Sequence, residues 1–183
     1  MQNFYNIPKH VREGTLDMYI IKPVSLQFIT TLRQVDFSIP VPNIIGGTVM
    51  VAIAWNRLHL AVSFRNIAGY LGILACGTVV AYAIYLAPQL LSFWIVKTGA
   101  LVEIADKGWD FNNMPMVIYN KWIQRAGMFV VPIFVIVNLP PMFLLNQLDR
   151  LYSVWIFVAP VLFLFLVRKF WNFAVRHYSS ASS

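Results

Sequence analysis

The sequence predicts an all-α integral membrane protein, with about four transmembrane helices and one or two amphipathic helices at the membrane interface. Three observations support this fold class. The chain of 183 residues is 59% hydrophobic and only 11% charged, whereas a soluble domain carries about 25% charged residues. Its apolar residues gather in four long stretches, and most of its cations fall in every second segment between or beside those stretches.

Each apolar stretch approaches the roughly 20 residues that a transmembrane helix needs. The four stretches cover approximately residues 41–58, 67–96, 126–145 and 151–170. The first is the weakest, because Gly46, Gly47 and Thr48 dilute it. The second carries no charge and, at about 1.5 Å per residue, exceeds the roughly 30 Å apolar slab of a bilayer. We therefore expect the second helix to tilt or to kink at Pro88.

The cations orient these stretches. Only Arg57, Arg65 and Arg150 fall in the segments that follow the first and the third stretch. The other eleven cations lie in the N-terminal segment, in residues 97–125 and in the C-terminal tail: Lys9, Arg12, Lys22, Arg33, Lys97, Lys107, Lys121, Arg125, Arg168, Lys169 and Arg176. Since positive residues accumulate in cytoplasmic loops, we expect a multi-pass membrane protein with both termini in the cytoplasm.

This orientation divides the chain into three parts. Residues 1–39 are expected to form a cytoplasmic segment that contains an amphipathic region. Residues 40–171 are expected to form the four-helix transmembrane region, and residues 172–183 a cytoplasmic tail.

Two segments on the expected cytoplasmic side have the periodicity of amphipathic helices. In residues 25–39 the apolar positions are Phe28, Ile29, Leu32, Val35 and Ile39, and the polar positions are Gln27, Thr30, Thr31 and Gln34. In residues 116–125 the apolar positions are Ile118, Tyr119, Trp122 and Ile123. We expect the second segment to lie in the plane of the membrane interface. The first segment is open to that interpretation and to a partner-docking role.

The sequence lacks the motifs of the common catalytic sites. It contains no G-x-x-x-x-G-K-[ST] loop, no H-E-x-x-H and no G-x-S-x-G. His10, His59 and His177 lie far apart, and the single cysteine, Cys76, excludes an intrachain disulfide. Its acids fall outside the apolar centres, whereas ion-coupled transporters usually keep ionisable groups within the membrane. We therefore expect no catalytic, cofactor or metal residues, no nucleic-acid binding, and an energy source outside this chain.

Five short motifs resemble, in their order and spacing, one family of membrane proteins. The first is Ile7-Pro8-Lys9-His10-Val11-Arg12-Glu13-Gly14-Thr15-Leu16-Asp17, which continues to Ile21-Lys22-Pro23. The last is Trp171 followed by Ala174-Val175-Arg176-His177-Tyr178-Ser179-Ser180-Ala181-Ser182. Between them stand Phe93-Trp94, then Pro115 with Ile118-Tyr119, then Pro132 with Leu139-Pro140-Pro141. The chain thereby resembles the permease subunits of type-2 ABC exporters, in the branch of ABC-2 family transporter proteins.

The resemblance implies a transmembrane permease subunit of an ATP-driven exporter. Such a subunit forms part of the substrate path, pairs with a second permease subunit as a homo- or heterodimer, and couples to a separate ABC ATPase subunit that hydrolyses the ATP. The family resembles six-helix proteins, so we expect this chain to be N-terminally truncated and to supply the last four helices. By the same resemblance, the ATPase-coupling segment includes Gly14, Leu16, Asp17, Lys22, Pro23, Phe28 and Leu32.

Three alternatives remain open. The chain is an inactive fragment, a membrane scaffold that transports nothing, or a membrane-embedded enzyme, for which no cluster of polar groups at one depth can be assembled from the sequence. The few polar residues within the apolar stretches suit a hydrophobic or amphipathic cargo, and ordinary hydrogen bonding between helices explains them equally well.

Overall fold

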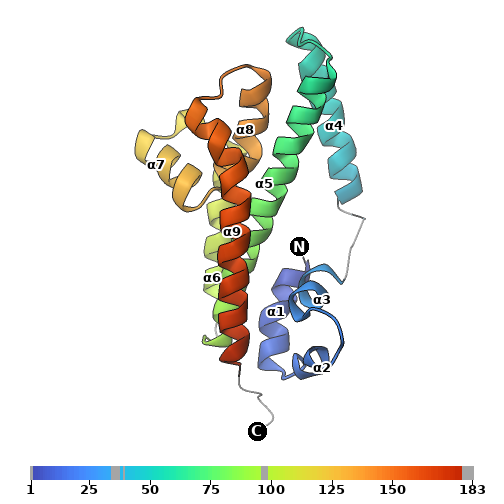
Figure 1. The fold of residues 1–183 in the computed structure, drawn as a ribbon, viewed down its shortest axis with the longest axis vertical. Coiled ribbons are helices and arrows are strands. Elements are labelled where there is room, and N and C mark those ends of the chain that lie inside the picture. Colours follow the sequence, from blue (N-terminus) through green and yellow to red (C-terminus); the bar gives the residue numbers. More distant parts are fainter. Residues whose placement is uncertain (1, 34–37, 39, 96–98, 179–183) are drawn as a thin grey trace.

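The computed structural model describes residues 2–33, 38, 40–95 and 99–178. Within these ranges the chain is helical and has no strand, which confirms the all-α class (Figure 1). The α-helices are α1 (Gln2–Arg12), α2 (Asp17–Ile20), α3 (Leu26–Leu32), α4 (Pro40–Arg57), α5 (Phe64–Leu90), α6 (Gly99–Trp109), α7 (Lys121–Arg125), α8 (Phe134–Leu144) and α9 (Arg150–Arg176). Shorter turns are η1 (Leu91–Phe93), η2 (Asp110–Asn113), η3 (Met116–Ile118) and the π-helical η4 (Ala126–Val130). The amphipathic positions Gln34, Val35 and Ile39, the end of the second apolar stretch at Val96, the cation Lys97 and residues 179–183 of the tail lie outside the described residues.

Two long helices form the axis of the molecule. Within the described residues, two unbroken helical segments are long and apolar enough to cross a membrane. They are Phe64–Phe93 and Arg150–Arg176. At about 1.5 Å per residue, a helix of 27 residues extends for about 40 Å, which exceeds a bilayer's apolar core. The helices expected near residues 67–96 and 151–170 are therefore confirmed as α5 and α9.

The two long helices run in the same direction and share two apolar cores. The upper core of Figure 1 lies between α5, α8 and the first half of α9, and it contains Ile73, Val80, Phe134, Val135, Leu139, Ile156 and Ala159. The lower core joins α1 to the other ends of α5 and α9, through Ile7, Ala83, Leu86, Leu90, Val167, Trp171 and Ala174. The N-terminal helices are thus fixed to the end of the molecule at which α9 finishes.

Helix α4 occupies the position expected for the first transmembrane stretch. It makes its contacts near its C-terminal end, where the Trp55 ring lies 6.3 Å from the Tyr70 ring and the Trp55 indole donates to the carbonyl of Leu60 at 3.1 Å. Residues 41–50 are exposed in this chain. As far as the described residues extend, α4 is not one of the helices that are long and apolar enough to cross a membrane, in keeping with the glycines and Thr48 that dilute this stretch.

The third apolar stretch, residues 126–145, is not one continuous helix but a bent pair of helices. Lys121–Val130 and Phe134–Leu144 are separate helical arms that meet at an angle of 104°. Pro132, which lacks a backbone N–H, lies between them and interrupts the helical hydrogen bonds. Helix α8 has 11 residues and is therefore about 16 Å long, too short for a bilayer of about 30 Å. Both arms lie in the upper half of the molecule (Figure 1).

The bend is held by close contacts with α8 and α9. A Cβ added to Gly127 would lie 2.4 Å from the Phe134 ring, so the glycine allows the two arms to approach. The Trp155 indole donates to the carbonyl of Met128 at 2.8 Å, and the Phe129 ring lies 5.2 Å from the Trp155 ring. The first arm therefore packs on the first turns of α9.

This packing corrects the expected position of two cations. Trp155 contacts the first arm, whereas Trp171 contacts the core that includes α1, and about 24 Å of helix separates these two positions. Lys121 and Arg125, in α7, therefore lie in the half of the molecule opposite α1–α3, and not with the termini. The helix expected over residues 116–125 is also interrupted, because Asn120 is extended and caps α7 by accepting the Ile123 N–H at 2.9 Å.

Candidate coupling site

Helices α1–α3 form a small unit at the lower end of the long helices (Figure 1). The side chain of Ile7 is fully buried against α5 and α9, and the Phe4 ring meets the Tyr82 ring edge-on at 5.7 Å. Between α1 and α3 the chain has α2 and two turns. This unit contains all seven residues that the resemblance assigns to ATPase coupling.

The first turn of the unit depends on a glycine. Gly14 has a φ of 67°, which glycine adopts without the steric cost that a side chain would bring. The Leu16 N–H then reaches the carbonyl of His10 at 3.2 Å, and the Leu16 side chain is fully buried. Asp17 begins α2, where its carboxylate favours the helix dipole. Gly14 thus follows α1 with a positive φ, and Asp17 lies in the first turn of α2.

Helix α3 turns its polar face inward. Gln27, Thr30 and Thr31 are 7%, 6% and 2% exposed, whereas Phe28 and Leu32 are 57% and 48% exposed. The threonine hydroxyls are satisfied within the helix, since Thr30 donates to the carbonyl of Leu26 at 2.8 Å and Thr31 to the carbonyl of Gln27 at 2.7 Å. The apolar face that would normally be buried is therefore the face that α3 presents outward.

Gln27 joins α3 to both long helices. Its Nε2 donates to the Tyr82 hydroxyl of α5 at 2.9 Å, and its Oε1 accepts from the guanidinium of Arg168 of α9. The Thr31 hydroxyl lies 3.3 Å from the same Tyr82 hydroxyl. A displacement of α3 would therefore be transmitted to α5 and α9 by hydrogen bonds as well as by apolar packing.

The residues assigned to coupling separate into two groups. Gly14, Leu16 and Asp17 shape the turn between α1 and α2. Lys22, Pro23, Phe28 and Leu32 are exposed, beside two further exposed apolar side chains, Ile21 at 83% and Val24 at 48%. We call Ile21, Lys22, Pro23, Val24, Phe28 and Leu32 the coupling surface.

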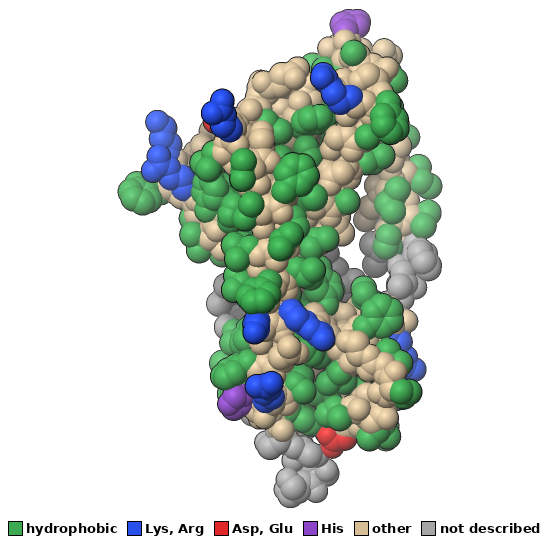
Figure 2. Space-filling model, viewed as in Figure 1, with side chains coloured by type: hydrophobic (Ala, Val, Ile, Leu, Met, Phe, Trp, Pro, Cys, Tyr) green, Lys and Arg blue, Asp and Glu red, His purple; other side chains and the backbone are tan. Residues whose placement is uncertain are grey.

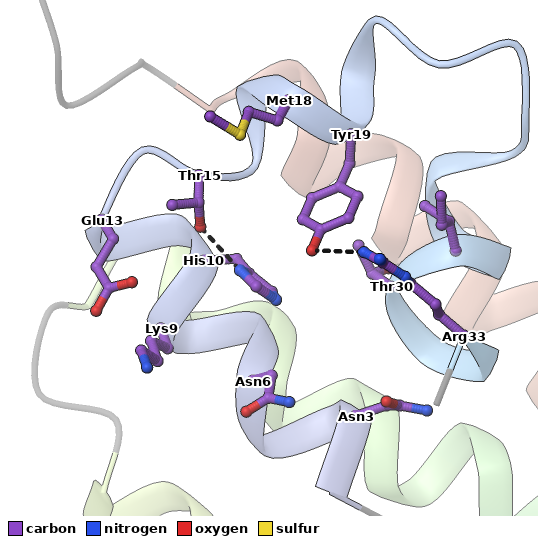
Figure 3. A pocket seen from close by; sticks show the side chains of 11 residues that line it. Asn3, Asn6, Lys9, His10, Glu13, Thr15, Met18, Tyr19, Thr30 and Arg33 are labelled. Atoms are coloured by element: carbon purple, nitrogen blue, oxygen red, sulfur yellow. Dashed lines mark hydrogen bonds between the residues drawn. The ribbon is translucent and has the colours of Figure 1, made fainter. Parts of the chain in front are cut away.

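A polar pocket of about 320 Å³ opens between α1, α2 and α3 (Figure 3). In it the His10 Nδ1 lies 2.8 Å from the Thr15 hydroxyl, and the Arg33 guanidinium donates to the Tyr19 hydroxyl at 3.1 Å. The His10 and Tyr19 rings meet edge-on at 5.1 Å. Lys9 also lines the pocket. These contacts fix the orientation of α2 between its neighbours.

Burial lowers the pKa of His10 below its ordinary value of 6.5. The carboxylate of Glu13 acts in the opposite direction, and the positive charges of Lys9 and Arg33 lower the pKa further. The folded protein therefore binds this proton less tightly than the unfolded chain does. Stability from the neutral imidazole is present above pH 6.5 and is lost as the pH falls from 6.5 through the lowered pKa.

We expect His10→Gln to reduce the loss of stability on acidification. The measurement is the thermal midpoint of the detergent-solubilised chain between pH 7.5 and pH 5, with the difference between wild type and variant compared at each pH. The midpoint of the wild type should fall more steeply with decreasing pH. Parallel curves would show that protonation of His10 does not oppose the packing of α1 and α2.

The sequence did not identify the polar partners in this unit. Tyr82 and Arg168 are 55 and 141 positions away from Gln27, and no local pattern connects them. Lys9, His10, Tyr19 and Arg33 converge because of the turn at Gly14. Among the described residues, no three His, Cys, Asp or Glu side chains gather to hold a metal ion, so the enzyme alternative gains no support from such a cluster.

Comparison with known proteins identifies a family for this chain. A family model described as ABC-2 family transporter protein matches residues 1–182. No curated protein and no solved structure matches the chain. The match covers the coupling surface, the bent pair of helical arms and both long helices.

Proposed function

The chain belongs to the family of ABC-2 transporter proteins, and from this premise we propose that it is the transmembrane permease subunit of an ATP-driven ABC exporter in the bacterial inner membrane. A separate ATPase subunit binds and hydrolyses ATP and docks on the coupling surface from the cytoplasm. A second permease subunit completes the substrate path, and the exposed apolar side chains of α4 are available to that subunit or to lipid.

The inverted helix α3 supports the coupling role most directly. Its polar face is engaged internally by Tyr82 and Arg168, while its apolar face points outward. An exposed apolar patch beside a charged residue, here Lys22, is typical of a protein interaction site. When the ATPase subunits close around ATP, movement of this surface rocks α5 and α9 through Gln27.

An apolar cavity supports a hydrophobic or amphipathic cargo. It has a volume of about 710 Å³ and lies between α5, α9 and the first helical arm. Its lining includes Ala83, Ala87, Gly127, Val131, Phe163 and Phe170. Ligand sites of this size are usually apolar with few polar groups. The cavity thus accommodates part of an apolar molecule on its way across the membrane.

Loss of the ATPase subunit from the coupling surface is the test of this proposal. We expect Phe28→Ser combined with Leu32→Ser to reduce co-purification of the ATPase with the permease about tenfold or more, because interfaces depend on a few large anchors. Both side chains are half exposed, so their replacement leaves the interior intact. Charge reversal by Asp17→Lys or by Lys22→Glu should also weaken the complex.

Matched charge reversals at the opposite end of the molecule serve as controls. Asp149→Lys and Arg150→Glu lie at the start of α9, far from α1–α3, and should leave the complex unchanged. An ATPase that co-purifies equally with wild type, with the Phe28/Leu32 double variant and with both charge reversals at Asp17 and Lys22 would contradict the proposal. That result would favour a helix α3 that simply lies in the membrane interface.

A further inference from the structure

A second recess lies where α3 begins and α9 ends. It has a volume of about 500 Å³, and its lining includes Ser25, Gln27, Arg168, Trp171, Asn172 and Arg176. The lining contains two guanidinium groups, a hydroxyl and two amides, and no carboxylate. Such a set of donors suits an anion, and arginine in particular suits the oxygens of a phosphate group.

One arginine of this recess is held in place before any ligand binds. The Gln27 side chain is 7% exposed, accepts from the Arg168 guanidinium and donates to the Tyr82 hydroxyl at 2.9 Å. Trp171, 3% exposed, forms an apolar wall beside it. A fixed guanidinium loses little side-chain freedom on binding, so the site is preorganised for its ligand.

The recess is continuous with an exposed apolar stripe on α9. Residues three or four positions apart share one face of a helix, and stepping from Arg168 towards the start of α9 gives Leu164, Val161, Phe157 and Val154. These four side chains are 45%, 70%, 69% and 58% exposed. Figure 2 shows hydrophobic side chains along this face, with Lys and Arg side chains below them.

A neighbouring lysine marks the level at which the stripe ends. The Lys169 ammonium lies 5.4 Å from the centre of the Phe165 ring, and Arg168 and Lys169 are the first charged residues of α9 after Arg150. Long basic side chains at this level reach the headgroup region of a bilayer while their stems remain in the apolar part. The recess therefore lies at headgroup depth.

We propose that this recess binds the phosphate-bearing headgroup of an anionic phospholipid, whose acyl chains lie along the stripe of α9. The proposal rests on the membrane setting of the proposed function. A free phosphate ion would satisfy the arginines but would leave the stripe unused. Basic pockets between helices on the cytoplasmic side of a membrane are suited to anionic lipid headgroups.

The test is a lipid titration of the full chain in detergent, with binding measured by native mass spectrometry. Phosphatidylglycerol should bind at least about fivefold more tightly than phosphatidylcholine, and Arg168→Gln and Arg176→Gln should each weaken its binding about fivefold, as expected for one interfacial cation. Lys169→Gln removes the same charge at the same depth outside the recess and should change binding less than about twofold, since its cation does not line the recess.

Several outcomes would overturn the proposal. These are equal binding of the two lipids, equal effects of the three variants, and full displacement of phosphatidylglycerol by millimolar inorganic phosphate, which would identify a phosphate site instead. Arg168→Gln also removes a contact of Gln27, so Arg176→Gln and Ser25→Ala provide tests that leave that contact in place. Lipid binding is measured without the ATPase subunit, so a failure here is distinct from a failure of the ATPase complex.

Discussion

Replacing Gly77 with valine will separate α8 from α5 and destabilise the apolar core of the protein. A Cβ at this position would lie 2.9 Å from the Cα of Ile136, a backbone atom of α8. A side chain could rotate away, but the backbone of a packed helix cannot do so without moving the helix. Small residues allow such close approach between membrane helices. Since overpacking a core costs about 1–3 kcal/mol, we expect the thermal midpoint in detergent to fall by several degrees.

The matched control is Gly72→Val on the same helix. Apart from its chain neighbours and the backbone of its own helix, a Cβ at Gly72 would have no described atom within 4 Å. Both variants carry the same change in helix propensity, so the difference between their thermal midpoints reports the contact with α8. Equal midpoints for the two variants would show that α8 does not pack against α5 at Gly77.

Gln27→Leu will uncouple ATP-driven movement from the transmembrane helices while leaving the ATPase complex assembled. Leucine is similar in size but removes the hydrogen bonds to Tyr82 and Arg168. A neutral hydrogen bond contributes about 1 kcal/mol and one to a charged group about 1.5–3 kcal/mol, so the connection between α3 and the long helices weakens substantially. The coupling surface itself is unchanged, because Gln27 lies on the buried face of α3.

The measurement is a pair of spin labels, one on α5 and one on α9, whose separation is compared with and without ATP and vanadate in the reconstituted complex. In the wild type, the separation of the labels should change when ATP and vanadate bind. Gln27→Leu should reduce this change at least about fivefold, because it removes hydrogen-bond energy of about 1 kcal/mol or more between α3 and the long helices. Gln124→Leu, which removes a side-chain hydrogen bond to the Tyr119 carbonyl in the other half of the molecule, is the control. An undiminished change in Gln27→Leu would mean that apolar packing alone carries the movement.

The apolar stretches predicted the long helices because composition alone decides which segments a bilayer can surround. The bend in residues 126–145 could not be predicted in the same way. Pro132 is the visible signal, but Pro160 lies in the middle of α9 without ending it. What distinguishes Pro132 is tertiary contact, above all the close approach of Gly127 to the Phe134 ring.

In the candidate site, the sequence drew attention to the turn between α1 and α2, but it did not predict how α3 packs. Gly14 and Asp17 belong to a motif of the sequence, and they lie in the turn after α1 and at the start of α2. The periodicity of residues 25–39 identified two faces of a helix, but it could not show which face points inward. The usual burial of apolar side chains is reversed in α3, because Gln27 finds partners on α5 and α9 that lie far away in sequence.

The central claim is that α1–α3 face the ATPase subunit on the cytoplasmic side, and site-directed crosslinking in cells tests it most directly. The native Cys76 is replaced with alanine, and a single cysteine at Phe28 or, as control, at Val62 carries a photoactivatable crosslinker. The label at position 28 should capture the ATPase subunit, and the label at position 62 should not. Capture from position 62, or no capture from position 28 in an assembled complex, would contradict the claim.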